Sequence, residues 1–171
     1  IHQSRVSYKR LAWNYMVDIA LAYGRQVENL LDQGGSLDSG VLEHILMNAN
    51  LEGVESSYTY IVDSEGNMLY HPNKDKIGKS VENVIVKSYI QDLKSGIKHD
   101  TYVVEYDYNG SIKYAACYTD ENGRFILVVS ADDDDVLRDS ASLIVRVTAI
   151  SLLIGMAAIV VVFIFIRKIV A

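Results

Sequence analysis

A run of twenty residues without a charge, near the C-terminal end, limits most strongly what this chain can fold into. Residues 147–166 read VTAISLLIGMAAIVVVFIFI. At about 1.5 Å per residue, a helix of this length crosses a hydrocarbon core about 30 Å thick. A core helix of the same length normally carries a polar stripe, which this run lacks. The pattern therefore predicts a transmembrane helix, which we place at residues 143–166.

The charges beside this segment predict its orientation. Arg167 and Lys168 follow the apolar run directly, and basic residues next to a span mark its cytoplasmic side. We therefore expect residues 1–142 to lie outside the cytoplasm, in a protein of the cell membrane that contacts lipid. Residues 167–171 would begin a cytoplasmic part that leads to an output module in the same chain. The first residue is Ile1, so we expect a piece of a longer protein.

Composition excludes several classes of function. The 171 residues include 22 acidic and 16 basic side chains, for a formal charge of -6, and no basic stripe is visible. Nucleic acid is therefore not an expected partner. Cys117 is the single cysteine, so no internal disulfide forms. No nucleophile and base lie at a recognisable catalytic spacing, and the sequence contains no phosphate-binding loop and no metal-binding helix motif. We therefore expect neither enzymatic activity nor a cofactor.

The first part of the chain has helical periodicity. Residues 6–31 place apolar side chains three and four positions apart, and Gly34 and Gly35 provide a stop. A short second helix is expected within residues 36–50. Because apolar residues cover much of the first helix, one side would pack on the domain and another on a partner subunit, as in a homodimer. We treat residues 1–35 as an N-terminal signalling helix.

The middle of the chain is dense in tyrosine and β-branched residues, which favour strands. Five extended segments are visible, and turn chemistry joins them as hairpins. Between the second and third segments, residues 72–100 form a longer connection with a helix near residues 85–96. We therefore predict an α+β domain at residues 36–142, with a five-stranded antiparallel sheet; the segments lie at residues 57–63, 68–71, 101–108, 111–119 and 125–131.

Three motifs in this order resemble the Cache family of PAS-like extracytoplasmic sensors. They are DSEGNMLYHP at residues 63–72, NGSIKYAA at 109–116 and NGRFILVV at 122–129. Phe125 stands where many relatives carry tryptophan. The resemblance implies a single sensor domain of the kind found on chemotaxis receptors, histidine kinases and cyclic-dinucleotide enzymes. It also implies a small organic ligand, a carboxylate or an amino acid, whose binding displaces a helix across the membrane.

Hairpin register predicts which face of the sheet holds this ligand. A type I′ turn at Asn109 and Gly110 places Tyr102, Tyr106 and Lys113 on one face. A lysine there could bind a carboxylate and tyrosine hydroxyls could orient it; alternatively, Lys113 is a solvated strand residue. His71 also has two interpretations: it contacts the ligand, or it is a corner residue whose side chain is hydrogen-bonded to the backbone. The ligand-binding residues that we expect are Lys113, Tyr102, Tyr106, Tyr60, Tyr70, His71, Tyr89 and Ser130.

Two alternatives to a small-molecule sensor are open from the sequence. The run of Asp132, Asp133, Asp134 and Asp135 could bind divalent cations beside anionic lipid, although acidic residues also cap the start of a helix. The other alternative is a ligand-free dimerisation domain with a filled sheet face. Outside the acidic run we expect no metal site, because the four histidines lack a ligand-like spacing.

Overall fold

The computed structural model describes residues 2–138, 149–151 and 156. Contacts divide the chain into two units, Ile1–Val136 and Leu137–Ala171. Among the helices within the described ranges, none combines the length and the apolar character that a membrane crossing requires. The predicted transmembrane helix at residues 143–166 lies outside the described residues except at positions 149–151 and 156, and residues 167–171 lie outside them entirely. The fold below is that of the first unit.

Two helices open the chain. The predicted long helix is confirmed as α1 (His2–Asp32), which is followed by α2 (Ser39–Leu46). The helical hydrogen bonds give way to a turn in which Gly34 has a φ of 83°, a conformation that suits glycine. The Asp38 carboxylate accepts from the backbone N–H groups of Gly40 and Val41 and so caps α2. The second helix is shorter than the predicted range of residues 36–50.

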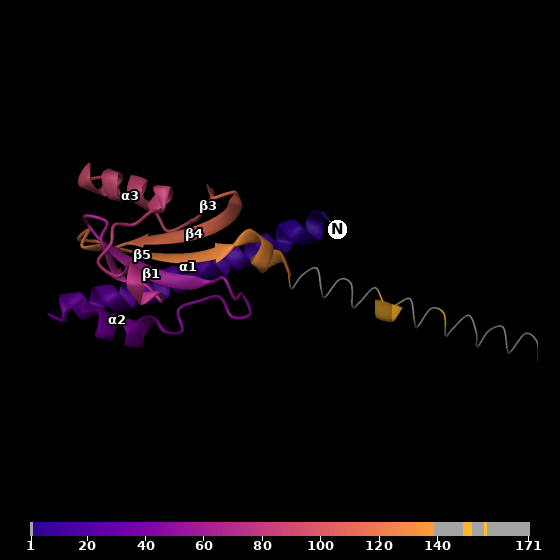
Figure 1. Cartoon of the computed structure of the whole chain (residues 1–171), viewed down its shortest axis with the longest axis horizontal. Helices are drawn as coiled ribbons and strands as arrows, with labels where there is room; N and C mark the ends of the chain where they lie inside the picture. Colours follow the sequence, from indigo (N-terminus) through magenta and orange to yellow (C-terminus); the bar gives the residue numbers. More distant parts are fainter. Residues whose placement is uncertain (1, 139–148, 152–155, 157–171) are drawn as a thin grey trace, which may run out of the picture. The chain divides into compact units, whose positions relative to one another are not determined.

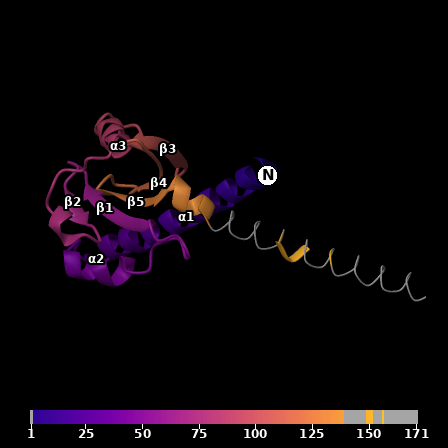
Figure 2. The same ribbon diagram turned by 45° about the vertical axis from the view of Figure 1, so that its right-hand side comes forward.

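The predicted antiparallel sheet of five strands is confirmed. Its strands are β1 (Tyr58–Asp63), β2 (Met68–Tyr70), β3 (Val103–Tyr108), β4 (Ser111–Thr119) and β5 (Phe125–Asp132). Their order across the sheet is β2-β1-β5-β4-β3, so β5 lies in the centre (Figure 2). The connection from β2 to β3 contains a short 3-10 helix, η1 (Lys74–Lys76), and α3 (Val84–Lys94). The chain therefore has the α+β class that the sequence predicts.

Hairpin register agrees with the sequence-based prediction. Tyr106 is opposite Lys113 across β3 and β4. Asn109 and Gly110 both have positive φ, 56° and 84°, as a type I′ turn requires. Ser130 is opposite Ala115 in the next pair. The faces of β3, β4 and β5 are thus those that the turn chemistry indicated.

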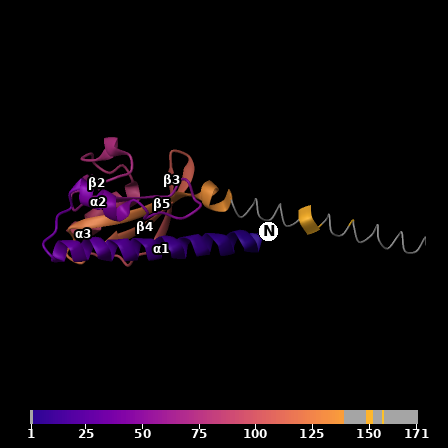
Figure 3. The same cartoon turned by 90° about the horizontal axis from the view of Figure 1, so that it is seen from below.

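The two faces of the sheet carry separate apolar cores. On one face, α1 and α2 pack on side chains such as Tyr114, Leu127 and Val129; Figure 3 shows α1 running along the sheet. On the other face, α3 packs on residues that include Cys117 and Val128. Figure 1 shows α3 and the pair of α1 and α2 on opposite sides of the sheet. The prediction that the first of these faces packs against the long helix is confirmed.

Gly24 allows α1 to approach β4 closely. A Cβ atom at this position would lie 2.3 Å from Cδ1 of Tyr118, whose ring is almost fully buried. Glycine in a helix interior costs about 1 kcal/mol relative to alanine. Glycine is nevertheless required at this position, because any side chain there would overlap the Tyr118 ring. The Tyr118 hydroxyl in turn donates to the buried carboxylate of Glu28.

We expect Gly24→Ala to lower the free energy of unfolding by about 1–3 kcal/mol, the usual cost of overpacking a core. The control is Gly40→Ala in α2, where a new Cβ would meet only an oxygen of Asp38 at 3.4 Å. That variant should be neutral or slightly stabilising, since alanine is the better helix former. Urea denaturation of both variants checks the prediction. Equal effects of the two substitutions would contradict a steric role for Gly24.

A buried aspartate organises the turn between β4 and β5. Asp120 is 0 % exposed. Its carboxylate accepts hydrogen bonds from the backbone N–H of Arg124 at 2.9 Å and from the Nε and Nη2 atoms of that side chain at 2.8 Å each. Arg124 also pairs with Asp32 at the end of α1, at 2.8 Å. The turn is thereby tied to the helix that covers the first core.

Candidate functional site

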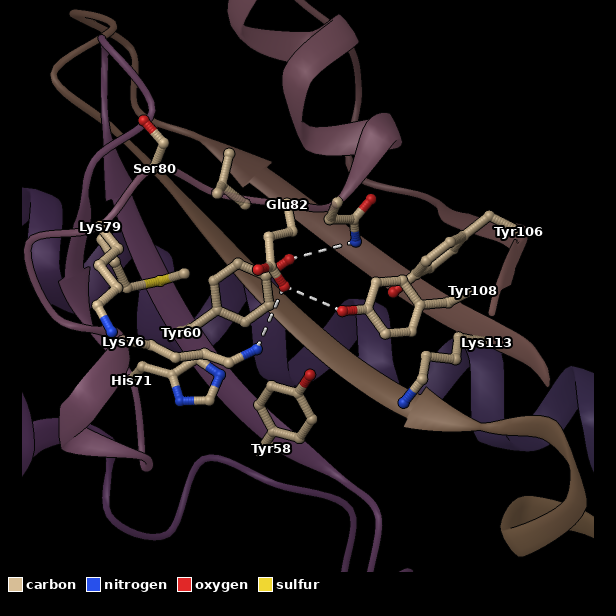
Figure 4. Close-up of a pocket in the computed structure, with 13 residues that line it drawn as sticks. Tyr58, Tyr60, His71, Lys76, Lys79, Ser80, Glu82, Tyr106, Tyr108 and Lys113 are labelled. Carbon is tan, nitrogen blue, oxygen red and sulfur yellow. Dashed lines mark hydrogen bonds and ion pairs between the residues drawn. The ribbon is translucent and has the colours of Figure 1, made fainter. Parts of the chain in front are cut away.

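A cavity of about 80 Å³ lies on the α3 side of the sheet, beside the connection that leaves β2. It has room for several water-sized groups and is smaller than the roughly 300–1,000 Å³ of pockets for drug-sized ligands. Figure 4 shows its side chains converging from the sheet and from the connection. The lining residues are Tyr58, Tyr60, Met68, His71, Lys76, Lys79, Ser80, Val81, Glu82, Asn83, Tyr106, Tyr108 and Lys113.

Cationic side chains outnumber anionic ones in this cavity. Three lysines and one glutamate line it. Glu82 pairs with Lys76 at 3.7 Å and accepts a hydrogen bond from the Tyr108 hydroxyl at 3.0 Å. Lys113 pairs with Asp132 and also lies 5.7 Å from the centre of the Tyr108 ring. Lys79, which is exposed, has no ion-pair partner among the described residues. The cavity therefore favours a ligand with negative charge.

His71 enters the cavity as a neutral hydrogen-bond donor. Burial lowers its pKa below the usual value, and the charge of Lys76 lowers it further. The backbone N–H of Asn73 donates to Nδ1 at 2.9 Å. With Nδ1 acting as acceptor, the proton of the neutral ring is on Nε2. The ring packs against Tyr58 and Tyr60, with centroids 5.1 and 5.8 Å away.

Three tyrosines of the cavity, Tyr60, Tyr106 and Tyr108, keep their hydroxyl protons across the physiological range. Burial raises the pKa of Tyr60 well above its usual value and that of Tyr106 to about 12. The hydrogen bond to Glu82 raises the pKa of Tyr108. The Tyr60 hydroxyl accepts a bond at 3.3 Å from the side-chain amide of Asn83, which also caps α3. These neutral hydroxyls can donate to a ligand oxygen as well as accept.

The structure brings four of the expected ligand-binding residues together. Lys113, Tyr106, Tyr60 and His71 all line the cavity. Ser130, a fifth, does not line it but is opposite Tyr58 across β1 and β5. Its side chain is fully buried.

The other three expected residues lie elsewhere. Tyr70 belongs to the core on the α1 side of the sheet. Tyr89, on α3, is buried and stacks on His99, with ring centroids 4.6 Å apart. Tyr102 is 46 % exposed and lines an open groove with Trp13 of α1. The expected set is therefore divided between the cavity and three other locations, and it is the cavity that combines a cation with several hydroxyls.

Several lining residues were missed by the sequence analysis. Tyr58 and Tyr108 are each two positions from an expected tyrosine, so strand alternation could have found them. Lys76 ends η1, and Lys79 and Glu82 lie between η1 and α3. No periodic pattern in this connection indicates which side chains point toward the sheet. Their contribution follows from how the connection folds over the sheet.

The acidic run that begins at the last residue of β5 is held by separate partners. Asp132 pairs with Lys113 of β4, and the Asp135 carboxylate accepts from the backbone N–H of Ser56 at 2.7 Å. Asp133 lies 3.9 Å from Lys9 of α1. Within the described part of the chain, no group of three His, Cys, Asp or Glu side chains is placed to hold a metal ion. The divalent-cation alternative stays a prediction.

The sequence matches no family model and no curated protein. Solved structures do resemble the fold. The ligand-binding domain of Mlp24 with asparagine is 12% identical, with a TM-score of 0.42, over 58% of this chain and 37% of that one. The extracellular domain of the putative histidine kinase mmHK1S-Z3 is 24% identical, with a TM-score of 0.43, over 60% and 40%.

A third neighbour is the ligand-binding domain of the Pseudomonas aeruginosa PAO1 amino acid chemoreceptor PctB in complex with L-Arg. It is 19% identical, with a TM-score of 0.40, over 61% of this chain and 38% of that one. The match therefore spans well under two thirds of each of these solved structures. The neighbours are ligand-binding domains of chemoreceptors and extracellular domains of histidine kinases.

Proposed function

We propose that this chain is the sensing part of a membrane receptor and that its cavity binds a small organic anion, a carboxylate or an amino acid. The observation that carries the proposal is the cavity itself, where three lysines and one glutamate face four tyrosine hydroxyls and a neutral histidine. A lysine ammonium attracts a carboxylate, and the hydroxyls and Nε2–H orient its oxygens. The role is one of binding rather than catalysis.

The size and lining of the cavity narrow the ligand class. About 80 Å³ suits a compact molecule, or a larger one that displaces part of the connection after β2. The tyrosine faces and Glu82 also offer positions for an ammonium group, so an amino acid fits the lining as well as a plain carboxylate. The ligand-free dimerisation alternative requires a filled sheet face, and the cavity on that face favours the sensor.

The remaining organisation completes the proposal. Residues 143–166 cross the membrane, residues 36–142 lie outside as the ligand-binding domain, and residues 1–35 act as a signalling helix in a homodimer. An output module in the same chain follows on the cytoplasmic side. Binding then shifts the helix that leaves β5 by on the order of 1–2 Å, the size of helix shifts in conformational switching at subunit interfaces.

A thermal-shift comparison of the full chain tests the ligand class. Acetate, succinate and L-alanine are the probes, ethanolamine is the cationic control, and ionic strength is matched throughout. A probe at about 100 times its Kd stabilises the folded state by about 2.7 kcal/mol, or roughly 5–10 °C for a chain of this length. We expect this shift from at least one of the three probes that carry a carboxylate. Equal shifts from ethanolamine, or none from any of these three probes, would contradict the proposal.

A further inference from the structure

The pair formed by Lys113 and Asp132 joins the cavity to the end of the sheet. The two residues are directly opposite across β4 and β5, and their side chains form an ion pair. Lys113 lines the cavity, and its side chain is only 15 % exposed. Asp132 is the last residue of β5. One carboxylate of the protein thus already engages a cation that a ligand carboxylate would use.

Asp132 also begins the segment that leaves the sheet, residues 132–136, which we call the departing segment. Its backbone N–H donates to the Ser56 hydroxyl at 3.1 Å, and the N–H of Ser56 donates to Asp135 at 2.7 Å. Helical backbone starts directly after it, at Asp133. The position of the departing segment therefore depends on contacts made at Asp132 and at its near neighbours.

We propose that Asp132 is an internal competitor for the ligand site, and that a ligand carboxylate binds by taking its place on Lys113. This inference rests on the proposed function. It adds a way in which ligand binding in the cavity changes the contacts that hold the departing segment. When the ligand takes Lys113, Asp132 loses its ion pair, and the backbone that follows is held less firmly. The same exchange sets specificity, because a ligand without an anionic group cannot replace the Asp132 carboxylate.

The test compares two neutralised aspartates in the full chain. Asp132→Asn removes the competitor. Asp134→Asn makes the same charge change at an exposed aspartate of the same run and is the matched control. Calorimetric titration with acetate and with succinate should give about 3- to 10-fold tighter binding for Asp132→Asn, and affinities within about twofold of the unmodified chain for Asp134→Asn. Amide hydrogen exchange at residues 132–136, without any probe, should be faster only in Asp132→Asn.

The outcomes separate this inference from the proposed function. Weaker or unchanged binding in Asp132→Asn, or equal gains in both variants, would overturn the inference while leaving the cavity as a ligand site. If the unmodified chain binds neither probe but Asp132→Asn binds one, the competitor is supported. If neither chain binds acetate or succinate, the inference is overturned, and the thermal-shift comparison, which includes L-alanine, decides on the proposed function. Unchanged exchange at residues 132–136 would also overturn the link to the departing segment. Should Asp132→Asn fail to fold, Asp132→Ser provides the same neutralisation.

Discussion

Replacing Lys113 by methionine should weaken binding of acetate and succinate by at least about tenfold, a loss of about 1.4 kcal/mol in binding free energy. Methionine keeps an unbranched apolar stem in a side chain that is 15 % exposed, and it removes the ammonium that faces the cavity. The fold should tolerate the change. Asp132 is left without this partner, but its side chain is 35 % exposed, so the loss of stability should not exceed about 1 kcal/mol.

Lys87→Met is the matched control for this variant. Lys87 is exposed on α3 and does not line the cavity, so its substitution changes the net charge equally without touching the site. Calorimetric titration with both probes, together with urea denaturation, measures affinity and stability for each variant. Unchanged affinity in Lys113→Met, or an equal loss in Lys87→Met, would remove Lys113 from the ligand site.

The second large effect concerns folding. Asp120→Ala should lower the free energy of unfolding by about 2–4 kcal/mol at neutral pH, because it removes charge-assisted hydrogen bonds made by a fully buried carboxylate. Asp107→Ala is the control. Asp107 is an exposed aspartate near the end of β3 and accepts one backbone hydrogen bond, from Gly110 in the β3–β4 turn at 3.0 Å. Urea denaturation should show a loss of about 1 kcal/mol or less for this control.

The effect of Asp120→Ala should depend on pH. Burial alone would raise the pKa of Asp120, but hydrogen bonds from Arg124 outweigh it and hold the pKa below its usual value. A carboxylate with a depressed folded-state pKa contributes stability above its unfolded pKa of about 3.9 and loses that contribution as the pH falls through the folded value. The difference between the unmodified chain and Asp120→Ala should therefore be full at pH 6 and shrink below about pH 4. A difference that does not vary with pH would contradict this role of the Asp120 charge.

Local sequence chemistry predicted much of the fold. The long helix followed from apolar spacing. The register of β3 and β4 followed from Asn109 and Gly110, because a two-residue turn leaves one pairing and alternation then assigns each side chain to a face. For that reason the sequence placed Lys113 and Tyr106 on one face of the sheet and the residues that pack against α1 on the other face. These are short-range relations between residues close in the chain, where the backbone offers few choices.

Tertiary structure decided what lies between distant segments. The pairing of β1 and β2 shifts between Ile61 and Val62, so that Tyr70 is opposite Ile61 and Met68 is opposite Val62. This irregularity sends Tyr70 to the α1 core and leaves Tyr60 in the cavity, a difference that alternation alone does not reveal.

The cavity wall and its link to the departing segment also depend on tertiary contacts. Lys76 and Glu82 reach the cavity because an aperiodic connection folds over the sheet. Lys113 and Asp132 meet because β4 and β5 align residues 19 positions apart. Repeating patterns and turn residues were therefore enough to predict the five strands and the faces of β3, β4 and β5. The position of each side chain in the site depended on long-range packing, which no local pattern encodes.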